Sequence, residues 1–286
     1  MMNQLSRALM TIGCRDSDPI PKCELAGKII ESNGELVQVM HNGLKVQAGG
    51  YYGDWMSHII RSLEGHHEPQ EELIFYHLLR YVRNSSLIVE LGCFWAYYSL
   101  WYLREVPNST AIGIEPDRDL LIGQHNANLN KLSNRIEFIN AWIGGQELQN
   151  YSAPTENSSK PISLPMHNGE SLIGLSGGKV VELLHLDTQG AELDFIKSLK
   201  VAADKKLVRF VMVSTHHSSI SGSANTHFDC LQQLRFLGGN ILVEHDVIES
   251  FSGDGLILAS FFPEDVNLPF PEISRNRAEA SLFSNY

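Results

Sequence analysis

The alternation of apolar and polar residues first becomes regular between Gly27 and Gly50. It runs around two turn dipeptides, Asn33-Gly34 and Asn42-Gly43. Because Asn-Gly readily adopts the positive φ angles of tight hairpin turns, the pattern predicts a three-stranded β meander. Such a meander is too small to be stable alone, so we expect it to cap a larger body. Residues 1–24 show no comparable pattern and are expected to be irregular.

The hydrophobic period then changes to that of a helix. Apolar residues recur at helical spacing and would share one buried face: Ile74, Phe75, Leu78, Leu79 and Val82. Three acids stand at or near the predicted first turn, where the helix dipole favours negative charge: Glu68, Glu71 and Glu72.

After this helix, strand patterns and helix patterns alternate. The predicted strands are nearly continuous apolar runs at 87–91, 111–115, 136–142, 181–187, 207–214, 241–248 and 255–261. The predicted helices fall near 95–105, 117–131, 190–201 and 224–237. Apolar strands separated by helices favour an α/β fold with an open, mostly parallel sheet covered on both faces.

The end of the chain departs from this alternation. The strands at 241–248 and 255–261 are joined by a short turn containing glycine, which makes an antiparallel pair. This is the chain order of a class I methyltransferase, whereas a dinucleotide-binding dehydrogenase would continue with strand–helix units. The prediction is therefore a Rossmann-like sheet with an antiparallel last strand.

Three parts are expected along the chain: an N-terminal extension with the meander (1–60), the α/β domain (61–262) and a proline-punctuated tail (263–286). The segment 148–180 is rich in Ser, Pro, Asn and Gly, and is expected to loop over the ligand face or one edge of the sheet. The tail could pack on a neighbouring copy, so a homo-oligomer stays an open alternative.

Composition narrows the possible partners. The 286 residues carry a net charge of −11, and no stretch is rich in Lys or Arg, so we expect neither nucleic acid nor a membrane surface as a partner. No apolar run approaches the length of a membrane span, and no secretory signal is recognisable. The four cysteines show no CxxC spacing, which favours reduced thiols in a cytoplasmic protein.

Candidate ligand-binding residues stand where the predicted strands end, because open α/β sheets bind ligands at the carboxyl ends of their strands. The first strand ends in Glu90 and turns at Gly92, and the second ends in Glu115. The spacing of just over twenty residues lets a carboxylate at Glu115 reach the ribose of an adenosine. The alternative is that Glu115 only stabilises the start of the next helix.

The turn after the first strand is bulkier than a usual cofactor loop. Gly92 supplies the tight turn, but Phe94, Trp95 and Ala96 occupy the later small positions. Ala96 is tolerable there if its φ angle is negative. We expect a remodelled cofactor loop that still functions.

Four stretches of the chain resemble the FkbM family of S-adenosylmethionine (SAM) methyltransferases. They are LDTQGAELDFIKSL at 186–199, the segment 68–100, IGIEPD at 112–117 and IEFINAWIGG at 136–145. The resemblance covers about residues 66–261 and is strongest at 184–199 and 111–117. The chain departs from the family pattern at Phe94, Ala96, His185 and Gln189.

The resemblance implies a role for each matching position. Glu90 and Gly92 would lie at the methionine moiety of SAM, and Glu115 at its ribose. Asp187 would lie near the transferred methyl group, and Glu192 would be structural. The residues implied beside the adenine are Asn140, Ala141 and Trp142.

Histidines follow the fifth predicted strand. His216 would stand at a strand tip next to Asp187, where a general base for a substrate hydroxyl is expected. His217 would contact the substrate, and the 215–226 loop would close over the site. The alternative is that His216 only bridges loop groups.

Asp187 and His216 together could also hold a divalent metal such as Mg²⁺, although a dedicated site needs more ligands. His66, His67 and Glu68 look like a metal cluster too, but adjacent ligands rarely converge and a helix start explains the acid.

Aromatic residues precede the α/β domain. Tyr51, Tyr52 and Trp55 could stack on a sugar or form a lid, and plain packing is the alternative.

The sequence thus predicts a SAM-dependent O-methyltransferase that acts on a hydroxyl of a sugar or another small polar metabolite, the sugar being implied by the resemblance alone. Two alternatives remain. One is a non-catalytic binding protein on the same scaffold, motivated by the bulky loop at 93–96. The other is a dinucleotide-dependent oxidoreductase, disfavoured by the lack of a GxGxxG motif and by the terminal strand pair.

Overall fold

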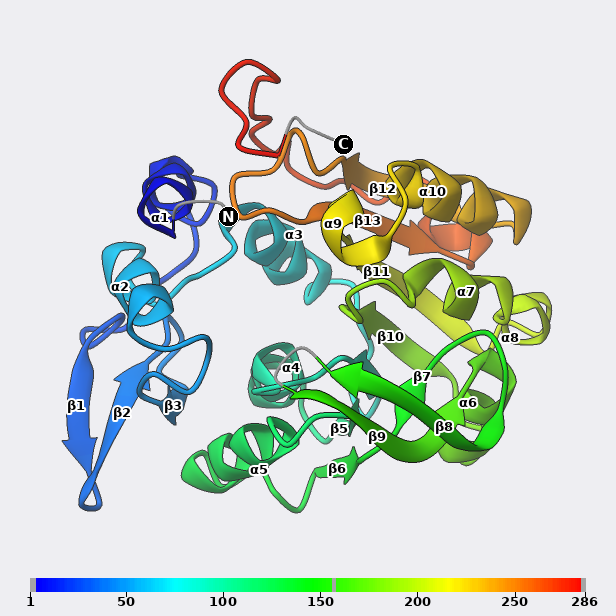
Figure 1. The fold of residues 1–286 in the computed structure, drawn as a ribbon, viewed down its shortest axis with the longest axis horizontal. Coiled ribbons are helices and arrows are strands. Elements are labelled where there is room, and N and C mark those ends of the chain that lie inside the picture. Colours follow the sequence, from blue (N-terminus) through cyan, green and yellow to red (C-terminus); the bar gives the residue numbers. More distant parts are fainter. Residues whose placement is uncertain (1–3, 156–157, 284–286) are drawn as a thin grey trace.

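A central seven-stranded sheet organises the molecule (Figure 1), whose computed structural model describes residues 4–155 and 158–283. The strands of this sheet are β4 (Leu87–Leu91), β5 (Thr110–Ile114), β6 (Ile136–Ile139), β10 (Val181–Leu186), β11 (Val208–Thr215), β12 (Asn240–His245) and β13 (Gly255–Ser260). All seven runs predicted from the sequence are present, the third and the sixth shortened at their ends.

The strand order is β12-β13-β11-β10-β4-β5-β6. The pairs from β11 to β6 are parallel, and β13 runs antiparallel to both β11 and β12. This order, with one antiparallel strand inserted near an edge, is that of the class I methyltransferase fold. The predicted fold class is therefore confirmed.

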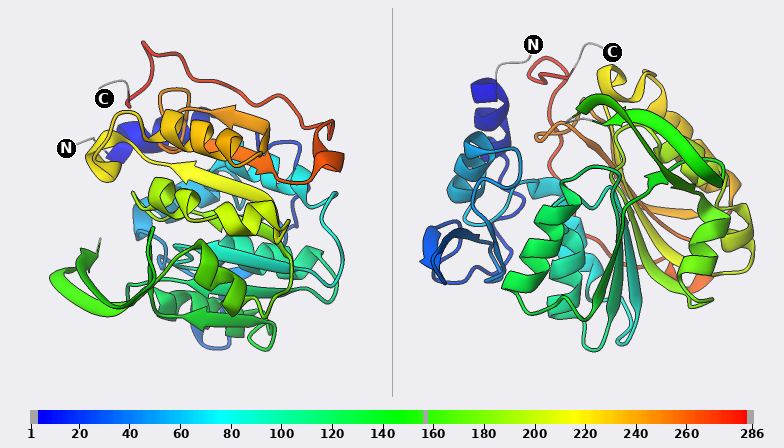
Figure 2. Two further views of the ribbon diagram at one scale, coloured as in Figure 1. Left: turned by 90° about the vertical axis from the view of Figure 1, so that its right-hand side faces the viewer. Right: turned by 60° about the horizontal axis from the view of Figure 1, so that its bottom comes forward.

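Two layers of helices cover the sheet, as the right-hand view of Figure 2 shows. One apolar core joins the sheet to α3 (Pro69–Leu78), α4 (Tyr97–Glu105) and α5 (Leu120–Leu129). The other joins it to α6 (Gly169–Leu175), α7 (Glu192–Lys197), α8 (Lys200–Asp204) and α10 (Thr226–Phe236). The short α9 (Ser218–Ser221) follows β11. Successive strand residues point into opposite cores, as the two-residue period of a strand requires.

The N-terminal region contains the predicted meander, formed by β1 (Ile29–Ser32), β2 (Glu35–Val39) and β3 (Lys45–Gln47). Asn33 and Gly34 both have the positive φ angles expected of the first turn. The side chains of Asn126, in α5, and Asn130, at its C-cap, accept hydrogen bonds from the β3 backbone, which ties the meander to the main body.

Two helices in this region were not predicted: α1 (Gln4–Gly13) and α2 (Asp54–Ser62). The expectation of an irregular segment up to residue 24 was wrong for residues 4–13 and is confirmed for 14–24, while residues 1–3 lie outside the described part. The helix α1 is held by long-range contacts, since the Thr11 hydroxyl donates to the Phe251 carbonyl oxygen at 2.8 Å.

The segment after β6 is a hairpin and not an irregular loop. A small second sheet contains β7 (Trp142–Ile143), β8 (Leu148–Thr155) and β9 (Ser158–His167). The hairpin β8–β9 projects from the body in the left-hand view of Figure 2. Its prolines and serines obscured the alternation of Ile162, Leu164 and Met166 along β9, which are the less exposed residues of that strand. The expectation that this segment reaches over the ligand face holds.

The C-terminal tail packs on its own chain. After the short 3₁₀ helix η1 (Pro263–Asp265), the Tyr81 hydroxyl donates to the Pro269 carbonyl oxygen, and Phe283 is buried beside α1. Within residues 4–155 and 158–283, none of the helices combines the length and apolar character that crossing a bilayer requires.

Candidate active site

Two neighbouring cavities lie at the carboxyl ends of the strands. The first cavity, of about 840 Å³, is bounded by the tips of β4, β5 and β10 and by the β8–β9 hairpin. The second cavity, of about 340 Å³, lies between α1, α2, α9 and the loop that joins β12 to β13. Both cavities are bordered by six residues, called here the shared wall: Tyr51, Tyr52, His67, Glu68, Asp187 and Gln189.

The first cavity gathers most of the predicted cofactor residues. Those that line it are Glu90, Gly92, Glu115, Trp142 and Asp187. Asn140 and Ala141 do not. The Asn140 amide donates to the carbonyl oxygens of Glu115 and Pro116 at 2.8 and 3.0 Å, and Ala141 is buried in the core. These two residues therefore lie outside the lining of the cavity and support the residues that form it.

Gly92 is required by strand packing. Its φ angle is +78°, and a Cβ atom there would lie 1.7 Å from the Asp187 carbonyl oxygen. No side chain fits at that distance, so only glycine lets the tips of β4 and β10 approach each other. This approach brings Asp187 next to the β4 turn.

The turn that follows is strained. Phe94 and Ala96 have φ angles of +41° and +60°, so the condition that Ala96 has a negative φ is not met. Each non-glycine residue in this region costs about 1 kcal/mol or more. The loop thus keeps the backbone of a glycine-rich turn with larger residues in place, and such strain is commonly found at functional sites.

The bulk of this loop forms one side of the first cavity, whose lining includes Phe94 and Trp95. The Trp95 ring stacks on Tyr51 with centroids 4.4 Å apart and an angle of 7°, and Phe94 meets the same tyrosine edge-on at 5.3 Å. The aromatic side chains therefore join the 51–52 segment to the loop, and the cavity beside them stays open.

Glu115 faces the first cavity from the tip of β5. Its carboxylate accepts hydrogen bonds from the backbone N–H groups of Phe94 and Asp117, at 3.2 and 2.9 Å. Burial raises the pKa of Glu115 to about 7, and the acids at 117 and 119 add to this rise. Two carboxylate oxygens with lone pairs to spare at a strand tip can accept the hydroxyl groups of a ribose.

Glu90 and His185 form the floor of the first cavity. The Glu90 carboxylate accepts from the Ser99 N–H at 2.9 Å, and burial raises its pKa. His185 Nε2 lies 2.7 Å from a Glu71 oxygen, and the Ser214 hydroxyl donates to the other oxygen of Glu71. Although burial alone would lower it, bonding to Glu71 brings the pKa of His185 to about 9. His185 can therefore place a positive charge at the floor of the first cavity.

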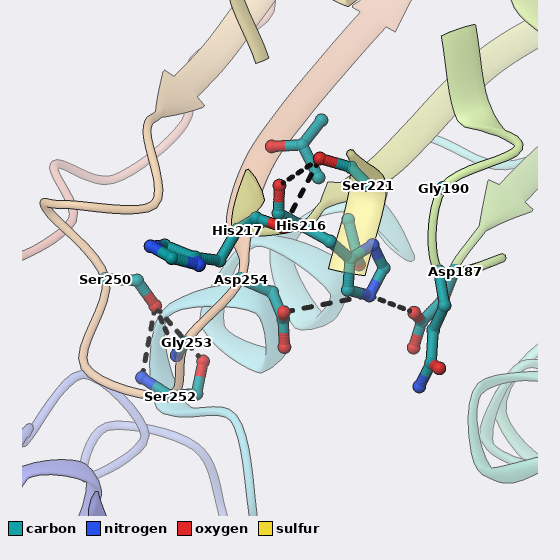
Figure 3. A network of polar contacts seen from close by, with 12 residues as sticks. Asp187, Gly190, His216, His217, Ser221, Ser250, Ser252, Gly253 and Asp254 are labelled. Carbon is teal, nitrogen blue, oxygen red and sulfur yellow. Dashed lines mark hydrogen bonds and ion pairs between the residues drawn. The ribbon is translucent and has the colours of Figure 1, made fainter. Parts of the chain in front are cut away.

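His216 lies among three carboxylates, two of which are labelled in Figure 3. Its Nε2 atom lies 3.0 Å from Asp187 and 3.7 Å from Asp254, and Nδ1 lies 3.1 Å from Glu192. Burial would lower the pKa of His216, but the attraction of these carboxylates dominates and raises it well above the usual value. The side chain is 3% exposed. These contacts suit a histidine that holds Asp187 in place, and the general-base role expected for His216 stays a prediction.

Asp187 is the member of this cluster that reaches both cavities. Its side chain is 32% exposed, against 17% for Asp254. Burial raises the pKa of Asp187, while the bond to His216 opposes that rise. An accessible carboxylate held by an imidazolium can accept a hydrogen bond, or a proton, from a bound hydroxyl.

Glu192 has the structural role expected for it. It is fully buried and accepts hydrogen bonds from the N–H groups of Thr188 and Gly190, which fixes the turn after β10. The turn before Asp254 is fixed by Ser250. Its buried hydroxyl accepts hydrogen bonds from the N–H groups of Ser252 and Gly253 (Figure 3). Burial raises the pKa of Asp254 to about 6.

The acids stand at the start of α3 as expected, Glu71 and Glu72 in its first turn and Glu68 at its N-cap, and all three are buried. Glu72 is buried and faces both preceding histidines, with His67 Nδ1 at 2.7 Å, and His66 contacts its other oxygen. His67 Nε2 lies 3.2 Å from Glu68. Although burial alone would lower it, these two acids raise the pKa of His67 to about 10. The segment is a buried ion-pair network that fixes part of the shared wall.

No metal site is supported at Asp187 and His216. Within the described ranges, the one group of three possible ligands within reach of each other is His41, His66 and Glu72. The His41 and His66 rings stack at 4.3 Å with an angle of 17°, which directs their in-plane lone pairs side by side. Such rings do not converge on a common ion, and Glu72 is already engaged, so a packing role accounts for this group.

The second cavity holds the three predicted substrate residues, Tyr52, Trp55 and His217. It also holds residues that were not singled out from the sequence, among them Arg7, Asp254 and Phe283. These come from the two ends of the chain and from the last strand connection. No local pattern marks them, because their role arises only when distant segments meet.

Comparisons with known proteins agree with the fold and go no further. No family model matches the chain and no curated protein matches it, so the FkbM resemblance stays a prediction. The chain is similar to TrmK from M. capricolum, determined with S-adenosylhomocysteine, at 12% identity over 72% of this chain and 75% of that one, with a TM-score of 0.43.

Two further solved structures are similar over comparable lengths. Precorrin-6y C5,15-methyltransferase from Geobacter metallireducens is 12% identical over 66% of this chain and 86% of its own, with a TM-score of 0.43. A putative O-methyltransferase from Klebsiella pneumoniae is 14% identical over 67% and 78%, with a TM-score of 0.40. The fold assignment depends on the strand order of the chain itself, which is that of the class I methyltransferase fold.

Proposed function

We propose that this protein is a SAM-dependent methyltransferase that transfers a methyl group to a hydroxyl of a small polar metabolite. The observation that carries the proposal is the first cavity. In a class I methyltransferase fold, it lies at the tips of β4, β5 and β10, with Gly92 at the tight turn and Glu115 one strand further along.

The side chains of the first cavity suit SAM. The Glu115 carboxylate can accept the ribose hydroxyls. Trp142 offers an aromatic face from β7, and its indole N–H is already used on the Ile162 carbonyl oxygen at 3.2 Å. Glu90 and Asp187 offer negative charge to a ligand that carries an ammonium and a sulfonium. SAM, when bound, supplies the electrophilic methyl group, so the protein has to position the acceptor and receive its proton.

We assign to Asp187 the acceptance of the proton that the acceptor hydroxyl loses. It borders both cavities, so a hydroxyl in the second cavity can reach it while SAM occupies the first. His216 keeps this carboxylate in place and is a positioning residue. Tyr52, Trp55 and His217 would contact the acceptor. A sugar is one acceptor that fits these aromatic and acidic side chains, as the family resemblance also implies.

The test is production of S-adenosylhomocysteine from SAM in the presence of a panel of sugars, polyols and other small alcohols. We expect turnover with at least one acceptor, and Asp187→Asn should lower kcat by roughly a hundredfold while leaving S-adenosylhomocysteine affinity nearly unchanged. Turnover that is insensitive to Asp187→Asn would remove the proton role. Tight cofactor binding without turnover on any acceptor would favour a binding protein on this scaffold.

A further inference from the structure

One arginine stands out in the second cavity. Arg7, from α1, is the only arginine or lysine among the described residues that line it. The first turns of α1 thus place a permanent positive charge on the acceptor side of the molecule.

The Arg7 guanidinium is held rigidly. Its Nε donates to the Ser252 carbonyl oxygen at 2.8 Å. Its Cζ atom lies 5.7 Å from the centre of the Trp55 ring and 5.8 Å from that of Phe283, within the range of cation–π contact. A Cβ atom at position 253 would lie 2.8 Å from Arg7 Nη2, so Gly253 leaves room for this approach.

The terminal nitrogens of Arg7, Nη1 and Nη2, make no hydrogen bond within the described residues. Over the part of the chain that the structure describes, no carboxylate oxygen lies within 4.0 Å of this guanidinium, and Nε makes its only hydrogen bond. Arg209 is the structural contrast. It pairs bidentately with Asp265, at 2.9 and 2.7 Å, and also bonds Glu182 and the Tyr81 carbonyl oxygen. Arg209 ties strands to the tail, whereas Arg7 presents open donors to a cavity.

The acids of the second cavity lie closer to histidines than to the Arg7 guanidinium, although Arg7 and Asp254 attract each other over a longer range. Glu68 faces His67 at 3.2 Å, and Asp187 and Asp254 face His216 at 3.0 and 3.7 Å. Asp187 and Asp254 share the imidazole of His216, and Glu68 contacts His67, so the remaining lone pairs of these acids can serve as hydrogen-bond acceptors. Because Asp187 belongs to the shared wall and Arg7 lines the second cavity alone, hydroxyl recognition and anion recognition fall at different places.

We propose that the second cavity binds a methyl acceptor that carries an anionic group, a carboxylate or a phosphate, in addition to its hydroxyl. The planar guanidinium of Arg7 binds this anionic group. This inference extends the proposed function and rests on it, because only a methyltransferase has a methyl acceptor. The binding of an anion by Arg7 is testable without methyl transfer.

The experiment is isothermal titration of the full chain with three probes of matched size: glycerol, glycerate and glycerol 3-phosphate. Each is titrated with and without saturating S-adenosylhomocysteine. We expect at least one anion to bind roughly tenfold or more tightly than neutral glycerol, because bidentate Arg–anion hydrogen bonds are strong. The two anions separate carboxylate from phosphate recognition.

Variants assign the effect to Arg7. Arg7→Gln should abolish the preference for the anion, and Arg7→Lys should retain only part of it, since an ammonium lacks the planar fork. Arg15→Gln is the matched control, because Arg15 is an exposed arginine paired with Asp18, and it should leave the preference unchanged. Unfolding temperatures of all variants exclude loss of fold as the cause. Gly253→Ala, which crowds Arg7 without removing it, should weaken anion binding as well.

Two results would overturn the inference: no anion binding better than glycerol in the wild type, or an anion preference that survives Arg7→Gln. Either result leaves the proposed function intact if S-adenosylhomocysteine binds in the same titrations. The opposite result is also informative. If S-adenosylhomocysteine does not bind but the anion preference still depends on Arg7, the methyltransferase proposal is wrong and the anion site remains.

Discussion

The two cavities differ in how the chain builds them. The first cavity is built mainly from consecutive strand–turn–helix units, so its residues follow predictable landmarks such as Gly92 and Glu115. The second cavity is assembled from α1, α2, the turn before β13 and Phe283 near the chain end. Local patterns can therefore reveal a cofactor cavity, while an acceptor cavity made of distant segments becomes visible only in three dimensions.

The cavities also differ in how their acidic side chains are bonded. Glu115 faces the first cavity as a carboxylate bonded only by backbone N–H groups. In the second cavity the acids are paired with buried imidazoliums. We therefore expect changes at the first cavity to alter ligand affinity, and changes at the second to alter stability as well.

The largest effect should come from His216→Ala. It would leave Asp187, Glu192 and Asp254 close together without their shared cation, and breaking a buried ion pair in this way costs about 3–5 kcal/mol. Urea unfolding monitored by circular dichroism measures the loss. His217→Ala, at the more exposed neighbouring position, is the control and should change the free energy of unfolding far less. Equal losses in both variants would contradict the assigned ion-pair cluster.

A large effect on affinity should come from Glu115→Ala. Loss of a charged hydrogen-bond acceptor for the ribose should weaken S-adenosylhomocysteine binding by roughly tenfold or more. The exposed Glu137, on β6, provides the matched control as Glu137→Ala. Unchanged affinity in Glu115→Ala would remove the ribose assignment.

The raised pKa of Glu115 predicts a pH dependence. Its pKa is about 7 in the folded protein, against an unfolded value near 4.5, so between these values the folded state binds more protons than the unfolded state. Stability from this group is present below pH 4.5 and is lost as the pH rises through 7. Glu115→Gln should therefore raise Tm by a few degrees at pH 8 and by less at pH 5. A Tm gain that does not vary with pH would contradict the raised pKa.

A smaller effect should come from the β8–β9 hairpin. Tyr151 meets Trp142 edge-on at 5.8 Å and lines the first cavity. Tyr151→Ala should weaken S-adenosylhomocysteine binding by roughly threefold, in line with an aromatic contact of about 0.5–1.5 kcal/mol. Ser152→Ala, at an exposed position of the same strand, should have no effect. Equal affinities would show that the hairpin does not contribute to the cofactor cavity.

The sequence predicted what short-range patterns control. The seven strands, their antiparallel end and the cofactor landmarks follow from apolar runs and turn residues. It missed what tertiary contacts decide: α1 is held by the Phe251 carbonyl oxygen, and the acids correctly expected at the start of α3 pair with histidines from the preceding turn. The contact of His216 with Asp254 was missed for the same reason, since Asp254 lies on a distant strand connection and only the fold brings it near.

The most direct test of the central claim is isothermal titration of the purified protein with S-adenosylhomocysteine, SAM and NAD. We expect SAM and S-adenosylhomocysteine to bind and NAD not to bind, with one ligand bound per chain in the first cavity. NAD binding in their place would indicate an oxidoreductase. Binding of none of the three would mean that the strained 93–96 turn no longer supports a cofactor, and would contradict the account.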